Sequence, residues 1–311
     1  MAPRLDVWLS NEVRAMSFDE QDFEPVRAAY PGLEIVHHRS WRDFEASVPE
    51  ADLIDTWAFP VAWYERAPRL RAIFTPAAGR DWVMAHPTGR VPVVHGTFHG
   101  PMIAESLLGL MLHFNRRIPQ MLANEAARGW NRNLQYPGSL LRNQRALLLG
   151  YGAIGRHCAR VLRSLGMEVV GCQRTRPEGT DPETGARLCR PGELEHELAQ
   201  ADHVVLLLPG GEETRGFLSR QRLGWFKPGS FLYNFGRGTT VDETDLLWAL
   251  DRGLLAGAGL DVTETEPLPP ESGLWAHPGV FVHPHSSCVY DEYRPMHVEE
   301  LSRQLEAFVV S

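Results

Sequence analysis

Apolar and polar positions alternate along the chain in two patterns, one typical of buried strands and one typical of amphipathic helices. Apolar runs of five or six residues predict strands at 5–9, 33–37, 51–56, 71–75 and 91–95. Helical spacing of the apolar positions predicts helices at 19–30, 41–48 and 63–67. Because strands that alternate with helices form parallel sheets with helical crossovers, we expect an α/β domain in this part of the chain.

The same alternation resumes further along the chain. Strands are predicted at 146–149, 168–172, 203–208, 230–235, 257–262 and 280–283, with helices at 193–200, 219–225 and 242–251. A long amphipathic pattern at 97–119 precedes them and is typical of core packing or a subunit interface. The tail at 291–310 is also helical in pattern and is expected to return to the first domain. We therefore predict one domain from residues 1–98 plus 288–311 and a second at 99–287, each a doubly wound parallel sheet.

A glycine-rich turn follows the apolar run at 146–149. Its sequence is Gly150-Tyr151-Gly152-Ala153-Ile154-Gly155, and helical spacing of apolar residues begins at its end. Strand, glycine turn and helix in this order are typical of a dinucleotide-binding site. Gly150 allows the tight turn, Gly152 lets a pyrophosphate approach the backbone, and Gly155 lets the helix pack close to the strand. We expect the turn and Arg156 after it to contact the cofactor phosphates at the helix start.

The residues after the next predicted strand bear on which dinucleotide binds. An NAD-preferring site carries an acidic residue about 20 positions beyond the glycines, for the ribose 2′-hydroxyl. Here that position is Gln173, followed by Arg174, Thr175 and Arg176. A neutral side chain followed by two arginines suits a 2′-phosphate better than a ribose diol, which predicts NADPH as the preferred cofactor and NADH as the alternative. The other interpretation is that both arginines are solvated in a polar loop.

Composition and charge exclude several classes of function. The net charge of −8 argues against a nucleic-acid backbone or an anionic membrane as the main partner. The apolar helical pattern at 102–114 is too short to span a bilayer. The four cysteines show no metal-ligand spacing, so we expect no metal site and a reduced, cytoplasmic protein. The first residues also lack the basic region and apolar core of a signal peptide.

Three polar stretches each follow a predicted strand of the second domain. They are 234–238 (NFGRG), 260–267 (LDVTETEP) and 283–287 (HPHSS). Because the carboxyl ends of parallel strands meet at one edge of a sheet, we expect these stretches to converge where the dinucleotide binds. They supply an arginine, carboxylates and histidines, which are groups able to bind an acid and to move a proton.

From these motifs the chain resembles the D-isomer-specific 2-hydroxyacid dehydrogenase family. The resemblance is specific over LLLGYGAIGR, LLLPGGEETRGFLS, LYNFGRGTTVDETDLLWAL, GAGLDVTETEPLP and HPHSS, and looser over AAGRD in the first domain. It implies a Rossmann cofactor domain and a flavodoxin-like substrate domain, and a catalytic Arg237, Glu266 and His285. It also implies a carboxylate site at Ala78 and Gly79, where an ordinary strand-to-helix turn is the other interpretation, and further cofactor contacts at Leu208, Pro209, Thr214, Phe235, Gly236, Asp261, His285 and Ser287.

The chemistry of the implied reaction accounts for these residue types. Arg237 offers a planar fork of donors for a substrate carboxylate and carbonyl oxygen. His285 has a reference pKa near neutrality and suits a general acid, and a nearby Glu266 would favour its imidazolium form. Glu264 and His283 are rivals for these two roles, and the family pattern favours Glu266 and His285.

The resemblance predicts a reductase of small anionic 2-oxo acids, in the glyoxylate and hydroxypyruvate class, that forms a homodimer. One alternative is an NAD-linked dehydrogenase of a D-2-hydroxy acid such as phosphoglycerate, against which Gln173 argues. The other is a dinucleotide-sensing protein that acts through partners. The presence of Arg237, Glu266 and His285 together argues against a pure binding role.

Overall fold

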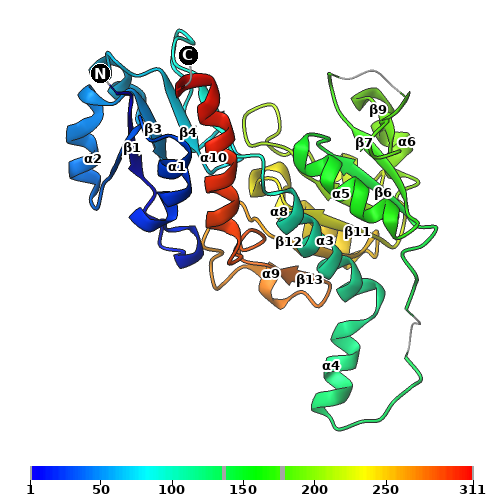
Figure 1. Cartoon of the computed structure of the whole chain (residues 1–311). Helices are drawn as coiled ribbons and strands as arrows, with labels where there is room; N and C mark the ends of the chain where they lie inside the picture. Colours follow the sequence, from blue (N-terminus) through cyan, green and yellow to red (C-terminus); the bar gives the residue numbers. More distant parts are fainter. Residues whose placement is uncertain (1, 135–137, 176–178, 310–311) are drawn as a thin grey trace. The chain divides into compact units, whose positions relative to one another are not determined.

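The computed structural model describes residues 2–134, 138–175 and 179–309, which fold as two compact α/β units (Figure 1). The first unit combines the chain up to His99 with the segment from Cys288 onward, and the second unit is Gly100–Ser287. The domain boundaries predicted from the sequence, after residue 98 and before residue 288, lie within one residue of these. The C-terminal helix α10 (Tyr293–Val309) therefore belongs to the same unit as the N-terminal strands.

The first unit is built on a parallel sheet of order β2-β1-β3-β4-β5. This 2-1-3-4-5 order is that of flavodoxin-like folds. β3 and β4 are buried along their whole length, as the apolar runs predict. The strands are β1 (Arg4–Trp8), β2 (Glu34–His37), β3 (Leu53–Thr56), β4 (Ala72–Thr75) and β5 (Val93–His95), and the helices include α1 (Glu24–Ala29) and α2 (Trp41–Ser47).

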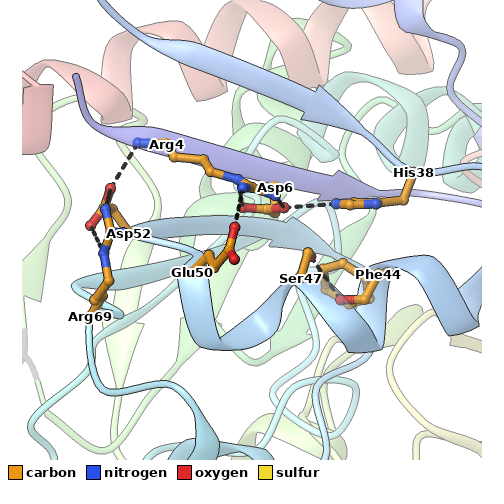
Figure 2. A network of polar contacts seen from close by, with 8 residues as sticks. All are labelled: Arg4, Asp6, His38, Phe44, Ser47, Glu50, Asp52 and Arg69. Atoms are coloured by element: carbon orange, nitrogen blue, oxygen red, sulfur yellow. Dashed lines mark hydrogen bonds and ion pairs between the residues drawn. The ribbon is translucent and has the colours of Figure 1, made fainter. Parts of the chain in front are cut away.

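A charged network is buried beside β1 of the first unit (Figure 2). Asp6 is fully buried, and its carboxylate accepts hydrogen bonds from Arg4 Nε at 3.0 Å and from His38 Nε2 at 2.7 Å. Burial alone would raise the pKa of Asp6, but these hydrogen bonds outweigh it and lower that pKa below its usual range. Arg4 also pairs with Glu50 at 2.8 Å. Because every charge has a partner, the network ties β1 to its neighbours without leaving a buried charge unpaired.

The second unit contains a larger sheet of order β13-β12-β11-β10-β6-β7-β9-β8. Its strands are parallel except for β8, which runs antiparallel to β9. Counted from β6, the order 3-2-1-4-5-6 of a Rossmann fold is present, and the point where the order reverses lies at β6. The strands are β6 (Arg145–Leu149), β7 (Glu168–Cys172), β8 (Gly179–Thr180), β9 (Arg187–Cys189), β10 (His203–Leu206), β11 (Ser230–Asn234), β12 (Leu255–Leu260) and β13 (Val280–Val282).

The helical pattern predicted at 97–119 forms two helices rather than one. α3 ends at Asn115, and Arg117 has a left-handed φ of 57° that breaks the helix before α4 begins. The apolar face of α3 lies against β12: a Cβ on Gly259 would stand 2.8 Å from Leu110, and one on Gly257 would stand 2.8 Å from Phe114. Core packing therefore accounts for this face. The helices of the unit are α3 (Gly100–Asn115), α4 (Ile118–Ala126), α5 (Ala153–Ser164), α6 (Leu194–Leu198), α7 (Arg220–Leu223), α8 (Glu243–Asp251) and α9 (Gly273–Ala276).

Other elements also differ between the prediction and the structure. The segment predicted as a helix at 63–67 is a 3₁₀ helix at Val61–Arg66, and β12 begins two residues before the predicted strand. The short strands β8 and β9 were not predicted, because their apolar runs are too short to stand out. Among the described residues, no helix has the length and apolar character needed to cross a membrane.

Candidate active site

Three adjacent strands of the second unit end at the same level of the sheet. Asn234 of β11 pairs with Leu260 of β12, and Leu260 pairs with Val282 of β13. The three polar stretches noted in the sequence follow directly from these strand ends. Arg237, Glu266 and His285 therefore come from neighbouring segments at one edge of one sheet, as predicted from the sequence.

His285 and Glu266 form a hydrogen-bonded pair. His285 Nδ1 lies 2.7 Å from Glu266 Oε2, and the two side chains are 45% and 38% exposed. The second carboxylate oxygen of Glu266 accepts from the backbone N–H of Thr263 at 3.1 Å. The hydrogen bond and charge of Glu266 raise the pKa of His285 above its ordinary value, against the effects of burial and of the Arg237 charge. The imidazolium form of His285 is therefore favoured. Its Nδ1 is bound to Glu266, and Nε2 lies on the other side of the ring.

The pKa of Glu266 moves in the opposite direction. Burial alone would raise it, but the hydrogen bond and charge of His285, with the Thr263 N–H, lower it below its usual value. Glu266 is thus held ionised beside His285. An ionised carboxylate on Nδ1 orients the ring and leaves its other nitrogen available for proton transfer.

The backbone around His285 is held in an uncommon conformation. His285 has a left-handed φ of 45°, and its N–H lies 2.7 Å from the carbonyl oxygens of both Asp261 and His283. The Asp261 carboxylate accepts from the backbone N–H groups of Ser286 and Ser287, each at 3.0 Å. The Ser287 hydroxyl also donates to Asp261 at 2.5 Å. Asp261, which is 3% exposed, therefore holds the loop that carries His285.

The rival residues of the sequence analysis lie elsewhere. His283 Nδ1 is 2.7 Å from Asp261 Oδ1, so this imidazole belongs to the Asp261 cluster rather than to Glu266. The Glu264 carboxylate is 54% exposed and lies 3.9 Å from Arg215. The geometry therefore joins Glu266 with His285 and leaves both rivals outside that pair.

Arg237 is positioned by the turn that follows β11. Its carbonyl oxygen accepts from Thr240 N at 3.0 Å, from Thr240 Oγ1 at 2.6 Å and from Asn234 Nδ2 at 3.2 Å. A Cβ on Gly238 would lie 1.9 Å from the backbone of Thr263, so only glycine permits this approach of the two loops. Asn234, which is 1% exposed, was not singled out in the sequence. Its place as a polar residue at the end of a buried strand is the signal that could have found it.

The glycine turn after β6 has the shape that a dinucleotide requires. Gly150 has a φ of 105°, and a Cβ there would stand 2.6 Å from the Leu207 carbonyl oxygen. A Cβ on Gly155 would lie 2.5 Å from the Gly150 carbonyl oxygen. Gly152, the N-cap of α5, faces open space, since a Cβ added there would have no neighbour within 4 Å among the described residues. The turn thus offers exposed backbone at a helix N-terminus, which fits a pyrophosphate.

Two side chains near the glycine turn are engaged with the protein. The ring of Tyr151 packs over Gly171, and its hydroxyl lies 2.5 Å from Thr184 Oγ1. The Arg156 guanidinium forms ion pairs with Asp181 at 3.1 Å and with Glu183 at 2.8 Å. Tyr151 therefore contributes its backbone to the turn, and the contact of Arg156 with cofactor phosphate stays a prediction.

The segments expected around the adenosine half follow β7 and β10. Gln173 donates its backbone N–H to Cys189 at 3.2 Å, and Arg174 pairs with Glu213 at 2.5 Å. Arg176 lies outside the described residues, and Thr175 is exposed. The Thr214 hydroxyl donates to the Pro209 carbonyl at 2.6 Å, and a Cβ on Gly236 would stand 2.5 Å from the Leu208 carbonyl. The loops after β10 and β11 thus pack backbone against backbone, whereas the segments after β7 and β10 meet through the side chains of Arg174 and Glu213.

The strand order and the glycine turn are those of a Rossmann-type dinucleotide-binding fold. A scan of protein families matches residues 108–287 to the NAD binding domain of D-isomer specific 2-hydroxyacid dehydrogenase. That range lies inside the second unit. The chain belongs to the D-isomer specific 2-hydroxyacid dehydrogenase family and is an NAD(P)-dependent oxidoreductase.

Several solved structures are similar over nearly the whole chain. A family member from Xanthobacter autotrophicus Py2, in complex with NADPH and MES, is 30% identical with a TM-score of 0.82, covering 99% of this chain and 96% of that one. A family member from Aeromonas salmonicida is 30% identical with a TM-score of 0.78, covering 99% and 97%. An NADPH-dependent glyoxylate/hydroxypyruvate reductase from Sinorhizobium meliloti is 27% identical with a TM-score of 0.79, covering 98% and 95%.

Proposed function

We propose that the protein reduces a small 2-oxo acid to the D-2-hydroxy acid, with NADPH as the preferred cofactor. The observation that carries the proposal is the His285–Glu266 pair, 2.7 Å apart and half-exposed at the edge of the sheet that also presents Arg237. A proton donor and an anion-binding guanidinium at one strand edge suit the reduction of a carbonyl next to a carboxylate.

Each residue of this site has a separate role. Arg237 binds the substrate carboxylate and carbonyl oxygen through its planar fork, and so orients the carbonyl carbon. His285, as imidazolium, donates the Nε2 proton to the carbonyl oxygen as that oxygen gains charge. Glu266 keeps the ring oriented and charged before the transfer. When bound, the nicotinamide supplies the hydride. In the reverse direction, neutral His285 would accept the proton.

The preference for NADPH is supported by the end of β7 and by two relatives. Gln173 supplies no carboxylate for a ribose 2′-hydroxyl, and Arg174 follows it with an exposed guanidinium. The Xanthobacter structure contains NADPH, and the Sinorhizobium enzyme is described as NADPH-dependent. The turn Gly150–Gly155 would hold the pyrophosphate.

The substrate class is proposed from size and charge. The Sinorhizobium relative is a glyoxylate/hydroxypyruvate reductase, and these acids need little more than a carboxylate site and a carbonyl site. In the first unit, Ala78 is exposed and Gly79 is half-buried just after β4, which makes their backbone available to a carboxylate. The first unit would then be the substrate domain and the second the cofactor domain.

A homodimer and a cytoplasmic location complete the proposal. No residue of α4 is buried, and its side chains Met121 and Leu122 are 38% and 55% exposed. Trp130, in the segment that follows, is 95% exposed. Apolar surface of this kind is typical of a subunit interface. The buried thiols Cys158, Cys172 and Cys189 are free, as expected in a reducing compartment.

The role of Arg237 is tested by replacing it with alanine. Loss of the guanidinium should lower kcat/KM for the 2-oxo acid by about 10²–10³-fold or more, because both anchoring and charge stabilisation are lost. NADPH affinity, measured by fluorescence titration, should stay close to that of the parent protein. Unchanged turnover would remove Arg237 from the mechanism.

A further inference from the structure

Arg174, the residue expected to recognise the 2′-phosphate, forms an ion pair with the carboxylate of Glu213. Arg174 Nη1 lies 2.5 Å from Glu213 Oε2, and the side chains are 74% and 75% exposed. Arg174 is the second residue beyond β7, and Glu213 belongs to the loop that follows β10. The two residues are 39 positions apart in sequence, so local sequence gave no sign of the contact.

This ion pair spans the strand that carries the glycine turn. In the sheet, β6 lies between β10 and β7. Neighbouring strands are about 4.8 Å apart, so the ends of β10 and β7 are roughly 10 Å apart. Only two long side chains reaching toward each other close that distance. The Arg174–Glu213 pair therefore crosses the strand end at which the Rossmann sheet reverses its order.

Both partners are held by their backbones. The N–H of Gln173, next to Arg174, donates to Cys189 of β9 at 3.2 Å, and Gln173 Nε2 is enclosed without an acceptor among the described residues. On the other side, Thr214 donates through its hydroxyl to Pro209 at 2.6 Å and through its N–H to Gly211 at 3.1 Å. These hydrogen bonds hold the turn at 209–214, in which the Glu213 carboxylate contacts Arg174.

We infer that Glu213 sets how strongly the enzyme selects NADPH over NADH, by competing with the 2′-phosphate for Arg174. The inference rests on the proposed function, in which Arg174 recognises that phosphate. The phosphate must take over guanidinium donors that Glu213 occupies, and the carboxylate repels the dianion at close range. NADH carries a neutral 2′-hydroxyl and meets neither effect. Glu213 is therefore a specificity-determining residue that weakens NADPH binding and so reduces the difference between the affinities for NADPH and NADH.

The size of the effect follows from the exposure of the pair. Exposed ion pairs are weak, so the phosphate displaces Glu213 at little cost. Replacing Glu213 by glutamine should tighten NADPH binding by about two- to fivefold and leave NADH binding unchanged. The gain should shrink as salt is added, because both charges are in contact with solvent.

The chain offers a matched control. Glu212 is in the same turn, is 93% exposed, and lies 3.9 Å from Arg215 rather than near Arg174. Glu212→Gln removes the same charge from the same loop and should change NADPH affinity much less than Glu213→Gln does. Any general effect of net charge on a dinucleotide would act on both variants alike.

The test is a set of dissociation constants measured by fluorescence titration with NADPH and NADH. The proteins are the parent chain, Glu213→Gln, Glu212→Gln, Arg174→Gln and the double variant of Arg174 and Glu213. Competition by 2′,5′-ADP and by 5′-AMP isolates the phosphate. We expect Glu213→Gln to tighten NADPH and 2′,5′-ADP only, and to have a smaller effect when Arg174 is already replaced, because only the direct repulsion between Glu213 and the phosphate then remains.

The outcomes separate the inference from the proposed function. If Arg174→Gln leaves NADPH affinity unchanged, recognition of the 2′-phosphate by Arg174 is wrong and the inference falls with it. If Arg174→Gln weakens NADPH but Glu213→Gln acts no differently from Glu212→Gln, the inference alone is overturned. Weaker NADH binding in Glu213→Gln would also overturn it, because Glu213 would then be a ligand of the ribose hydroxyl.

Discussion

At the scale of single residues, the site depends on which of several similar side chains meet. Two histidines and two glutamates follow β12 and β13 within a few positions of each other. The structure pairs His285 with Glu266 at 2.7 Å and His283 with Asp261 at 2.7 Å. Each imidazole thus has its own carboxylate, and the two pairs share the loop that Asp261 holds. His285, the proposed acid, and His283, which is bound to Asp261, are therefore only two positions apart in the sequence but have different partners.

The pH dependence of turnover should report the Glu266 contact. The hydrogen bond and charge of Glu266 raise the pKa of His285, so Glu266→Gln lowers it. Reduction needs the imidazolium, so kcat/KM is highest below the pKa of His285 and falls as pH rises through it. In Glu266→Gln this fall should move to lower pH. The measurement is kcat/KM for 2-oxo acid reduction across a pH series.

Glu264→Gln is the matched control for that series. It removes the same charge two positions away, from a carboxylate that is 54% exposed and outside the His285 pair. Its pH profile should follow that of the parent protein. A shift in Glu264→Gln with none in Glu266→Gln would reverse the assignment of the two glutamates.

The residue types of the site could be predicted from the sequence, whereas several contacts could not. Arg237, Glu266 and His285 follow buried strands, and the carboxyl ends of such strands meet. Asp261 was predicted only as a cofactor contact, which stays a prediction, and its contacts with the 283–287 loop were not predicted. Arg156 was predicted near the pyrophosphate and pairs with Asp181 and Glu183. Contacts between side chains distant in sequence leave no periodic signal.

At the scale of elements, the buried strands were the most predictable part of the fold. Strands such as β7 and β11 have buried residues at nearly every position, so a continuous apolar run marks them. α4 is the opposite case, because none of its residues is buried, and the only local sign of the break at Arg117 is Pro119, in the first turn of α4. Within its unit, α4 projects away from the sheet (Figure 1). An exposed apolar helix of this kind points to a partner surface.

The proposed homodimer predicts the effect of a charge on α4. Leu122 is 55% exposed on this helix, and an aspartate there would be buried without a partner in a dimer. Leu122→Asp should shift the protein from twice the chain mass of 35.0 kDa to the monomer in light scattering after gel filtration. Met84→Asp, at a residue 53% exposed in the first unit, should leave the mass unchanged. A parent protein that is already monomeric would contradict the proposal.

At the scale of the whole molecule, each unit follows a known doubly wound strand order. The first has the order of flavodoxin-like folds and the second the order of Rossmann folds, as the resemblance implied. The family match over 108–287 places NAD binding in the second unit. The proposed acid–base pair and Arg237 lie in that same unit. The first unit, which we propose as the substrate domain, carries the weakest sequence motifs, and for this reason the sequence predicts a substrate class rather than one acid.

The central claim is that this site reduces a 2-oxo acid with NADPH. The most direct measurement is the loss of nicotinamide absorbance with glyoxylate, hydroxypyruvate, pyruvate and phenylpyruvate, each with NADPH and with NADH. We predict loss with glyoxylate or hydroxypyruvate, at higher kcat/KM with NADPH than with NADH. Loss with NADH alone would contradict the cofactor assignment. No loss with any of these acids, from a protein that binds NADPH, would contradict the proposed function itself.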